Sequence, residues 1–136
     1  MGIFHLAYNA DDLDKARDFY GPVLGCAESR STKTWVDFNF FGHQISPHLG
    51  PVMASTPTGE VGAYKVAMPH PGVVLPQSQW QQLADHLTRA QMEFTLAPTT
   101  RFAGEPGEQS TMFFHEPAGN PTEIKRVTEM SKVFAT

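Results

Sequence analysis

The sequence has a single cysteine, Cys26, among its 136 residues, which excludes a disulfide framework and a cysteine-based zinc site. No run approaches the ~18 apolar residues of a membrane span. No basic and then apolar leader stands at its start. Only 10 residues are Lys or Arg, they form no cluster, and the net charge is −4, which argues against a nucleic-acid partner. We therefore expect a soluble, cytoplasmic protein that binds neither membrane nor nucleic acid.

What is present suits one folded domain over residues 1–136. Hydrophobic residues make up 40% of the chain and charged residues 18%, a balance that supports a packed core. Gly and Pro, 11 of each, predict many turns. Any chemistry must come from the six histidines, the carboxylates or a bound cofactor.

The first half of the chain predicts one helix among four strands. Leu13, Ala16, Phe19 and Tyr20 recur at helical spacing after a capping turn at 9–12, and Gly21-Pro22 should end that helix. In 34–41 the residues alternate with period two, so Trp35, Asp37 and Asn39 share one face. Gln44, Ser46 and His48 share a face of the return strand. The predicted strands are 3–8, 26–30, 34–41 and 44–49, and 50–64 is a loop, the best candidate for a lid or linker.

The second half repeats this plan. Ser78 and Gln81 predict a capping box, and Trp80, Leu83, Ala84 and Leu87 follow at helical spacing. A loop is expected over 98–109, and a hairpin turn over 116–120. The predicted strands are 70–75, 92–97, 110–116 and 121–127.

The two halves therefore have the same order, βαβββ. Their helical apolar positions align at one constant spacing, Leu13 with Trp80, Ala16 with Leu83, and Tyr20 with Leu87. We predict an α+β fold of two βαβββ repeats packed side by side, with a curved mixed sheet around a central cleft and the helices outside. The predicted divisions are a first unit 3–49, a linker 50–65, a second unit 66–127 and a tail 128–136.

Ligand-type side chains fall at matching places in the two repeats. His5 and His70 lie on the first strands, each followed two positions later by a small residue that leaves room for a ligand. His48 and Glu123 lie on the last strands. Two imidazoles and one carboxylate can hold one face of a divalent ion, as in non-haem Fe(II) sites, and the same set suits catalytic zinc. The alternative is structural: buried core histidines, and a surface Glu123 paired with Lys125.

Several segments resemble vicinal oxygen chelate proteins, a superfamily that includes glyoxalase I, bleomycin-resistance proteins and extradiol dioxygenases. Phe4–Tyr8, Asp12–Tyr20 and Val23–Cys26 resemble its opening. Phe114–Ile124 resembles its closing motif, with Glu116 in place of the usual aspartate. Segments 35–44, 101–102 and 106–109 resemble a bacterial branch of predicted extradiol-type dioxygenases. The resemblance covers about residues 3–127.

The resemblance implies a metal in the cleft, held by His5, His70 and Glu123. In glyoxalase I the last strand of the first unit supplies a further ligand, and here the matching residue looks like His48. In ring-cleaving dioxygenases that position is not a ligand, so His48 would be a donor beside the site or a proton carrier. Fe(II) is the first expectation, with Ni, Zn, Mn or Co as alternatives.

Three functions remain open. The first is a metal-dependent extradiol-type dioxygenase acting on a small catechol-like substrate. The second is a glyoxalase-like isomerase or lyase, which would work without oxygen. The third is a metal-free protein that sequesters a toxic small molecule, as resistance proteins do. The candidate substrate-binding residues are Trp35, Asp37, Asn39, Arg101, Gln109 and Phe113.

Two of these candidates have a specific expectation. Arg101 and Gln109 flank a Pro- and Gly-rich loop, where the arginine would pair with a substrate carboxylate or would simply be solvated.

We also expect a homodimer, because C2 dimers are the commonest assembly. Whether the cleft closes within one chain or across two stays open. The apolar residues available for that interface are Val52, Met53, Val61, Val133 and Phe134.

Overall fold

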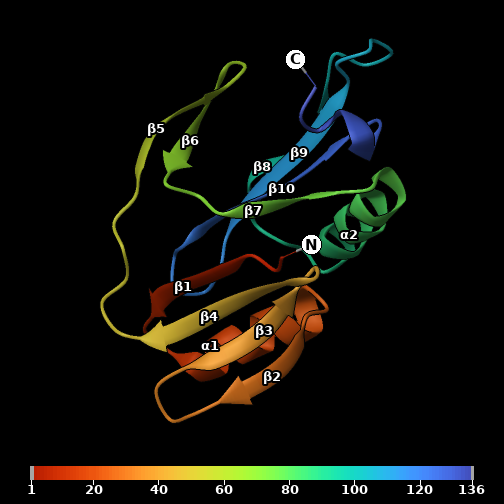
Figure 1. Cartoon of the computed structure of the whole chain (residues 1–136). Coiled ribbons are helices and arrows are strands. Elements are labelled where there is room, and N and C mark those ends of the chain that lie inside the picture. The colour runs from red at the N-terminus through yellow and green to blue at the C-terminus, as the bar shows by residue number, and fades with distance from the viewer. Residues whose placement is uncertain (1, 136) are drawn as a thin grey trace. The chain divides into compact units, whose positions relative to one another are not determined.

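A computed structural model describes residues 2–135 (Figure 1). The chain divides into two compact units, which are described separately. The first contains the chain up to Thr56 together with Glu116–Asn120. The second contains Pro57–His115 and the chain from Pro121 onward.

The first unit holds one complete βαβββ module. Its sheet has the order β1-β4-β3-β2, in which β1 and β4 are parallel and the other pairs are antiparallel. The elements are β1 (His5–Ala10), α1 (Leu13–Asp18), a π-helical turn (Phe19–Val23), β2 (Ala27–Ser31), β3 (Val36–Phe40) and β4 (His43–Leu49).

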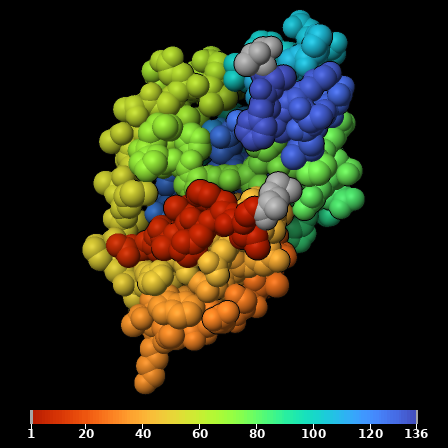
Figure 2. All heavy atoms as spheres, in the orientation of Figure 1, coloured from red at the N-terminus to blue at the C-terminus, as the bar shows by residue number. Residues whose placement is uncertain are grey.

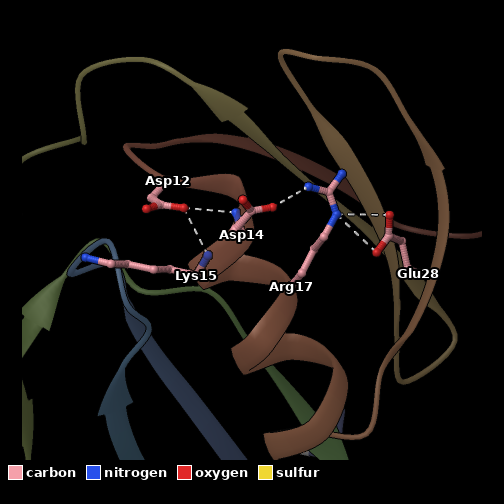
Figure 3. A network of polar contacts seen from close by, with 5 residues as sticks. All are labelled: Asp12, Asp14, Lys15, Arg17 and Glu28. Atoms are coloured by element: carbon pink, nitrogen blue, oxygen red, sulfur yellow. Dashed lines mark hydrogen bonds and ion pairs between the residues drawn. The ribbon is translucent and has the colours of Figure 1, made fainter.

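Helix α1 begins at a side-chain cap, as the sequence predicts. The carboxylate of Asp12 accepts the backbone N–H groups of Asp14 and Lys15 at 2.9 and 3.0 Å. Figure 3 shows this cap beside Arg17, whose guanidinium pairs with Asp14 in the helix and Glu28 on β2 at 3.2 Å each. These contacts fix the start of the helix and tie it to the edge strand.

The prediction that Gly21-Pro22 ends the helix needs a correction. The regular α-helix ends earlier, at Asp18, and the chain continues as a π-helical turn that contains Pro22. In this wider turn the N–H of Leu24 donates to the carbonyl of Phe19 at 3.0 Å. The turn therefore closes across the proline, which has no N–H to contribute.

The second unit holds the second βαβββ module and one extra hairpin. Its main sheet has the order β7-β10-β9-β8, with β7 and β10 parallel, which repeats the topology of the first unit and confirms the predicted repeat. The elements are β5 (Thr56–Val61), β6 (Tyr64–Met68), β7 (Gly72–Leu75), α2 (Gln77–Arg89), β8 (Phe94–Arg101), β9 (Gln109–His115), β10 (Pro121–Val127) and a 3-10 turn (Met130–Lys132).

The hairpin β5–β6 overturns the expectation of a loop over 50–64. Its two strands form a sheet of their own, and Val66 packs with Leu96 and Phe113 of the main sheet. Gly59 allows this packing, because a Cβ there would lie 2.7 Å from Val66 Cγ2. The segment forms strands because it packs against the main sheet, and not because apolar residues alternate within it.

Three smaller predictions also fail in the second unit. Helix α2 begins after Pro76 without a side-chain cap, so Ser78 and Gln81 form no capping box. Strand β8 continues to Arg101, which shortens the expected 98–109 loop. His70 precedes β7 and does not lie on it, because the flanking prolines Pro69 and Pro71 cannot donate to a strand ladder.

The predicted helical faces are buried in both units, apart from Phe19, which is half-buried and begins the π-helical turn. Trp80 on α2 also donates its indole N–H to the carbonyl of Ile124 at 2.9 Å, which fixes α2 against β10 (Figure 1). Burial of each leucine in these faces contributes about 1.5–3 kcal/mol to stability. The buried set is Leu13, Ala16 and Tyr20 in the first unit and Trp80, Leu83, Ala84 and Leu87 in the second. No helix within residues 2–135 is both long and apolar enough to cross a membrane.

Candidate metal centre and adjoining cavity

His70 and Glu123 meet on the face of the second unit's sheet. Glu123 lies on β10, opposite Phe113 of β9 and Gly72 of β7. His70 lies just before β7, and its Nε2 is 3.2 Å from Glu123 Oε2. Both side chains are mostly buried, with exposed fractions of 16% and 17%. The structure thus brings together two of the three predicted metal ligands.

Both groups are held by neighbours on the side away from each other. His70 Nδ1 lies 2.7 Å from the carbonyl oxygen of Ala67, and Thr111 donates its hydroxyl to Glu123 Oε1 at 2.8 Å. The Phe113 ring packs edge-on against the imidazole, with ring centres 5.0 Å apart. These contacts fix the imidazole and carboxylate orientations, as supports behind metal ligands do.

The contact with Ala67 determines where the histidine proton lies. A carbonyl oxygen only accepts, so His70 Nδ1 carries the hydrogen and, in the neutral ring, Nε2 carries a lone pair. That lone pair faces a carboxylate oxygen, also an acceptor, at 3.2 Å. A proton between the two atoms, on either His70 or Glu123, or a metal ion would satisfy both of them. Bonds of about 2.1 Å place neighbouring ligands of one ion about 3.0–3.4 Å apart, so the pair fits a metal.

His5 shows the same arrangement in the first unit. Asp37 on β3 accepts from the side-chain amide of Gln44 at 3.2 Å, so the amide oxygen of Gln44 points away from it. That oxygen lies 2.7 Å from His5 Nδ1, which must be the donor. The exposed Nε2 of His5 is left with its lone pair. Asp37 therefore sets the tautomer of His5 through Gln44.

The other first-unit candidates have partners of their own. Asp37 is buried and also accepts from the hydroxyl of Ser46. Trp35 and His48 lie opposite each other and stack, with ring centres 6.2 Å apart. Asn39 is exposed and accepts the N–H of Gly42 at 2.7 Å.

The strand register corrects the match between His48 and Glu123. In the second unit, Glu123 pairs with Gly72, two residues after His70. In the first unit, the residue two after His5 is Ala7, and it pairs with Ser46. Matching the two histidines therefore makes Ser46 the counterpart of Glu123. His48 lies one pleat further along β4, which removes the basis for treating it as the fourth-ligand position.

Gly72 has a different role from the one predicted. The sequence suggested that a small residue there leaves room for a ligand. A Cβ at Gly72 would lie only 1.9 Å from the backbone carbonyl oxygen of Glu123. Gly72 is therefore required by the close approach of β7 to the strand that carries Glu123.

A cavity of about 330 Å³ adjoins the pair within the second unit. Arg101, Gln109, Thr111 and Lys125 on the main sheet line it together with His70 and Glu123, and hairpin residues such as Gly59 and Met68 form another wall. Figure 2 shows a hollow beside the yellow-green hairpin, with blue atoms at its floor. Lys125 was not predicted as a cavity residue, although its position two residues after Glu123 places it on the same strand face.

Three His, Cys, Asp or Glu side chains do not converge anywhere within residues 2–135 to hold a metal ion. The second unit supplies a ligand pair, and His5 belongs to the first unit.

The first unit also buries a group of weak acids away from the His5 face. The hydroxyls of Tyr8 and Tyr20 are hydrogen-bonded to each other, and burial raises the pKa of both phenols. Burial likewise raises the pKa of the Glu116 carboxyl, whose Oε2 has no hydrogen-bond partner among the described residues. Burial raises the pKa of the Cys26 thiol to about 11, so this free cysteine is a weak nucleophile.

Comparison with known proteins gives one family match. Residues 2–124 match the model of the glyoxalase/bleomycin resistance protein/dioxygenase superfamily. None of the curated proteins matches the chain.

Several solved structures are also similar to this chain. A glyoxalase/bleomycin resistance protein/dioxygenase from Alicyclobacillus acidocaldarius has 29% identity and a TM-score of 0.78, over 98% of this chain and 96% of that one. The fosfomycin resistance protein FosX from Listeria monocytogenes has 15% identity and a TM-score of 0.70, over 97% of each chain. A lactoylglutathione lyase from Agrobacterium tumefaciens has 16% identity and a TM-score of 0.64, over 99% of this chain and 97% of that one.

Proposed function

Because the chain belongs to the glyoxalase/bleomycin resistance protein/dioxygenase superfamily, we propose that it is a metal-dependent enzyme of the vicinal oxygen chelate type. Members of this superfamily include glyoxalases, fosfomycin resistance proteins and dioxygenases, and they commonly use divalent metals. The proposed reaction is extradiol-type cleavage of a small catechol-like substrate with Fe(II).

One observation carries the metal part of the proposal. His70 Nε2 and Glu123 Oε2 are both acceptors when the ring is neutral, yet they face each other at 3.2 Å. These two side chains would together hold a divalent cation, and Ala67 and Thr111 hold the far side of each group. His5, whose Nε2 is likewise left free, is the proposed third ligand.

The remaining residues have supporting roles. When bound, the metal supplies a Lewis acid and a template for two neighbouring substrate oxygens. Gln44 and Asp37 hold the His5 ring, so we assign Asp37 to positioning rather than to substrate contact. His48, stacked on Trp35, is the proposed proton carrier. Trp35, Asn39, Arg101 and Gln109 are proposed to border the substrate. Phe113, predicted as a substrate residue, is instead buried with Val66 and Leu96 and packs behind the His70 ring.

The first experiment is metal analysis of protein purified anaerobically without chelator. We expect close to one Fe(II) per chain. Glu123→Gln should lower the metal affinity by more than the ~10–100-fold loss that follows when a residue supporting a ligand is changed. Glu93→Gln is the matched control, because Glu93 is exposed and lies outside the cavity. Full metal retention in both His70→Ala and Glu123→Gln would refute the proposed centre.

The second experiment distinguishes the dioxygenase reaction from the glyoxalase-like reaction and from metal-free binding. Oxygen uptake with a panel of catechols should accompany product formation, and Ni(II) or Zn(II) should not replace Fe(II). Turnover without oxygen, supported by Ni(II) or Zn(II), would refute the dioxygenase and favour the glyoxalase-like lyase. Small-molecule binding by protein that holds no metal would favour the resistance-type binding protein.

Superfamily members are typically small-molecule-binding dimers, and we propose a homodimer that acts in the cytoplasm. Met53 and Phe134 are exposed apolar residues available for its interface, and Val52 and Val133 are half-buried, whereas Val61 packs against its own unit. Light scattering that shows a 15 kDa species would refute the dimer. Co-expression of His5→Ala with Glu123→Gln should restore part of the bound metal only if one centre draws ligands from two chains.

A further inference from the structure

Two cationic side chains, Arg101 and Lys125, share the cavity wall with His70 and Glu123, and neither has an anionic partner among residues 2–135. We propose that Arg101 and Lys125 bind an oxyanion, a carboxylate or phosphoryl group, carried by the substrate. This inference rests on the proposed function for the use of the cavity, but anion binding is measured without catalysis. It names the substrate class: a small acid with chelating oxygens at one end.

The strand register places the two cations on the ligand-bearing face. Glu123 and Lys125 are two residues apart on β10, so both side chains leave the sheet on the same side. Lys125 pairs with Thr111 on β9, and Gln109, two residues earlier, pairs with Arg101 on β8. The face therefore carries Glu123, then Lys125, then Gln109 with Arg101, in successive rows.

Neither cation is neutralised by a carboxylate in the described part of the chain. Within residues 2–135, the side chains of Arg101 and Lys125 form no ion pair with Asp or Glu, although both are half-buried. Glu60 on the hairpin wall is paired with Lys65 at 2.7 Å, and Glu123 is engaged by His70 and Thr111. Partly desolvating two unpaired cations is unfavourable, and a bound anion would remove that penalty.

The guanidinium of Arg101 packs against an aromatic ring, and this contact leaves its N–H donors available. Its guanidinium carbon lies 5.1 Å from the centre of the Phe102 ring. Because this contact is with an aromatic ring, it occupies none of the N–H groups with an anion, and two of them can form parallel bonds to an oxyanion. Gln109, which pairs with Arg101 in the same row, adds an amide to the lining of the cavity.

The row spacing limits the length of the substrate. Neighbouring rows on one strand face are roughly 7 Å apart, so the anion lies about 7–14 Å from the Glu123 row. This span fits a chelating group separated from its acid group by a ring or a short chain. A cavity of about 330 Å³ is at the small end of the usual ligand range, which favours a small substrate.

The test measures binding of benzoate and of inorganic phosphate by titration calorimetry at low ionic strength, using the full chain before and after metal loading. Wild-type protein should bind at least one probe at millimolar concentration, and the tighter probe identifies a carboxylate or phosphoryl group. Arg101→Gln and Lys125→Gln should each weaken binding about 10-fold or more, and Arg101→Lys should recover part of it. Arg89→Gln, an exposed change on α2, should have no effect.

If the protein bound no metal but still bound the anion probes, the proposed metal-dependent enzyme would be refuted and the anion site would stand. Intact metal binding without detectable binding of either probe would overturn the anion site alone. Equal binding by wild type, Arg101→Gln and Lys125→Gln would also overturn it. In the metal-loaded protein, both variants should discriminate less between a carboxylated catechol and catechol itself. Circular dichroism checks that each variant is folded.

Discussion

Gly72→Ala tests whether the close contact between β7 and β10 positions Glu123. The new Cβ would lie 1.9 Å from the Glu123 carbonyl oxygen and 2.9 Å from its carbonyl carbon. Both neighbours are backbone atoms, so no side-chain rotation relieves the overlap. The two strands must separate by more than 1 Å to reach ordinary contact, roughly 3.2 Å for carbon and oxygen.

The expected loss of stability follows from the contacts that this separation of the strands disrupts. The N–H of Glu123 donates to the carbonyl of Pro71 at 3.0 Å, and losing this bond costs about 1 kcal/mol. Overpacking between two strands adds about 1–3 kcal/mol. We therefore expect the free energy of unfolding to fall by about 2–4 kcal/mol and Tm to fall by on the order of 10 °C. Displacement of Glu123 should also weaken metal binding.

Urea unfolding and metal titration of the same preparations provide the readout. Gly107→Ala is the control, because a Cβ there meets nothing within 4 Å and the backbone is not left-handed. The control should change stability by less than about 1 kcal/mol. If Gly72→Ala is no less stable than Gly107→Ala and binds metal as wild type does, the strand contact does not position Glu123.

Two further predictions concern the first unit. Burial raises the pKa of the Glu116 carboxyl, so the folded protein holds this proton more tightly than the unfolded chain. Stability from this group should therefore decline as pH rises from about 4 through the raised pKa, and urea unfolding of Glu116→Gln should show a smaller decline; identical pH dependence would contradict this. Asp37→Asn should release the orientation of Gln44 and mix the two tautomers of His5, seen in the imidazole nitrogen NMR shifts, whereas the exposed Asp11→Asn should not. An unchanged His5 spectrum in Asp37→Asn would rule out the relay.

The sequence predicts best what depends on local periodicity. Alternation placed Gln44 and Ser46 on one strand face, and helical spacing identified Trp80 and Leu87 as buried. The order of elements in each module is likewise confirmed. These features need only the 2.0 and 3.6 residue periods, because each residue's face is fixed by its own element.

Features that depend on pairing between distant segments were not predictable in the same way. The parallel register of β1 with β4 makes Ser46 the counterpart of Glu123, and no period in the sequence specifies that register. The hairpin β5–β6 depends on packing of Val66 against the main sheet. The bond from Thr111 to Glu123 likewise links two strands. Such contacts depend on how the chain folds back on itself.

The turn between β9 and β10 has a consequence for inheritance. The flanking strands belong to the second unit, but Glu116–Asn120 belongs to the first, where Asn120 donates to the carbonyl of Asn9 at 3.2 Å. A gene cut near residue 56 would therefore encode a first unit that lacks a buried piece of itself. Recombination that exchanged only the residues before 56 would combine a new first segment with the old turn. The two units, although alike in pattern, are therefore not encoded by two separate stretches of sequence.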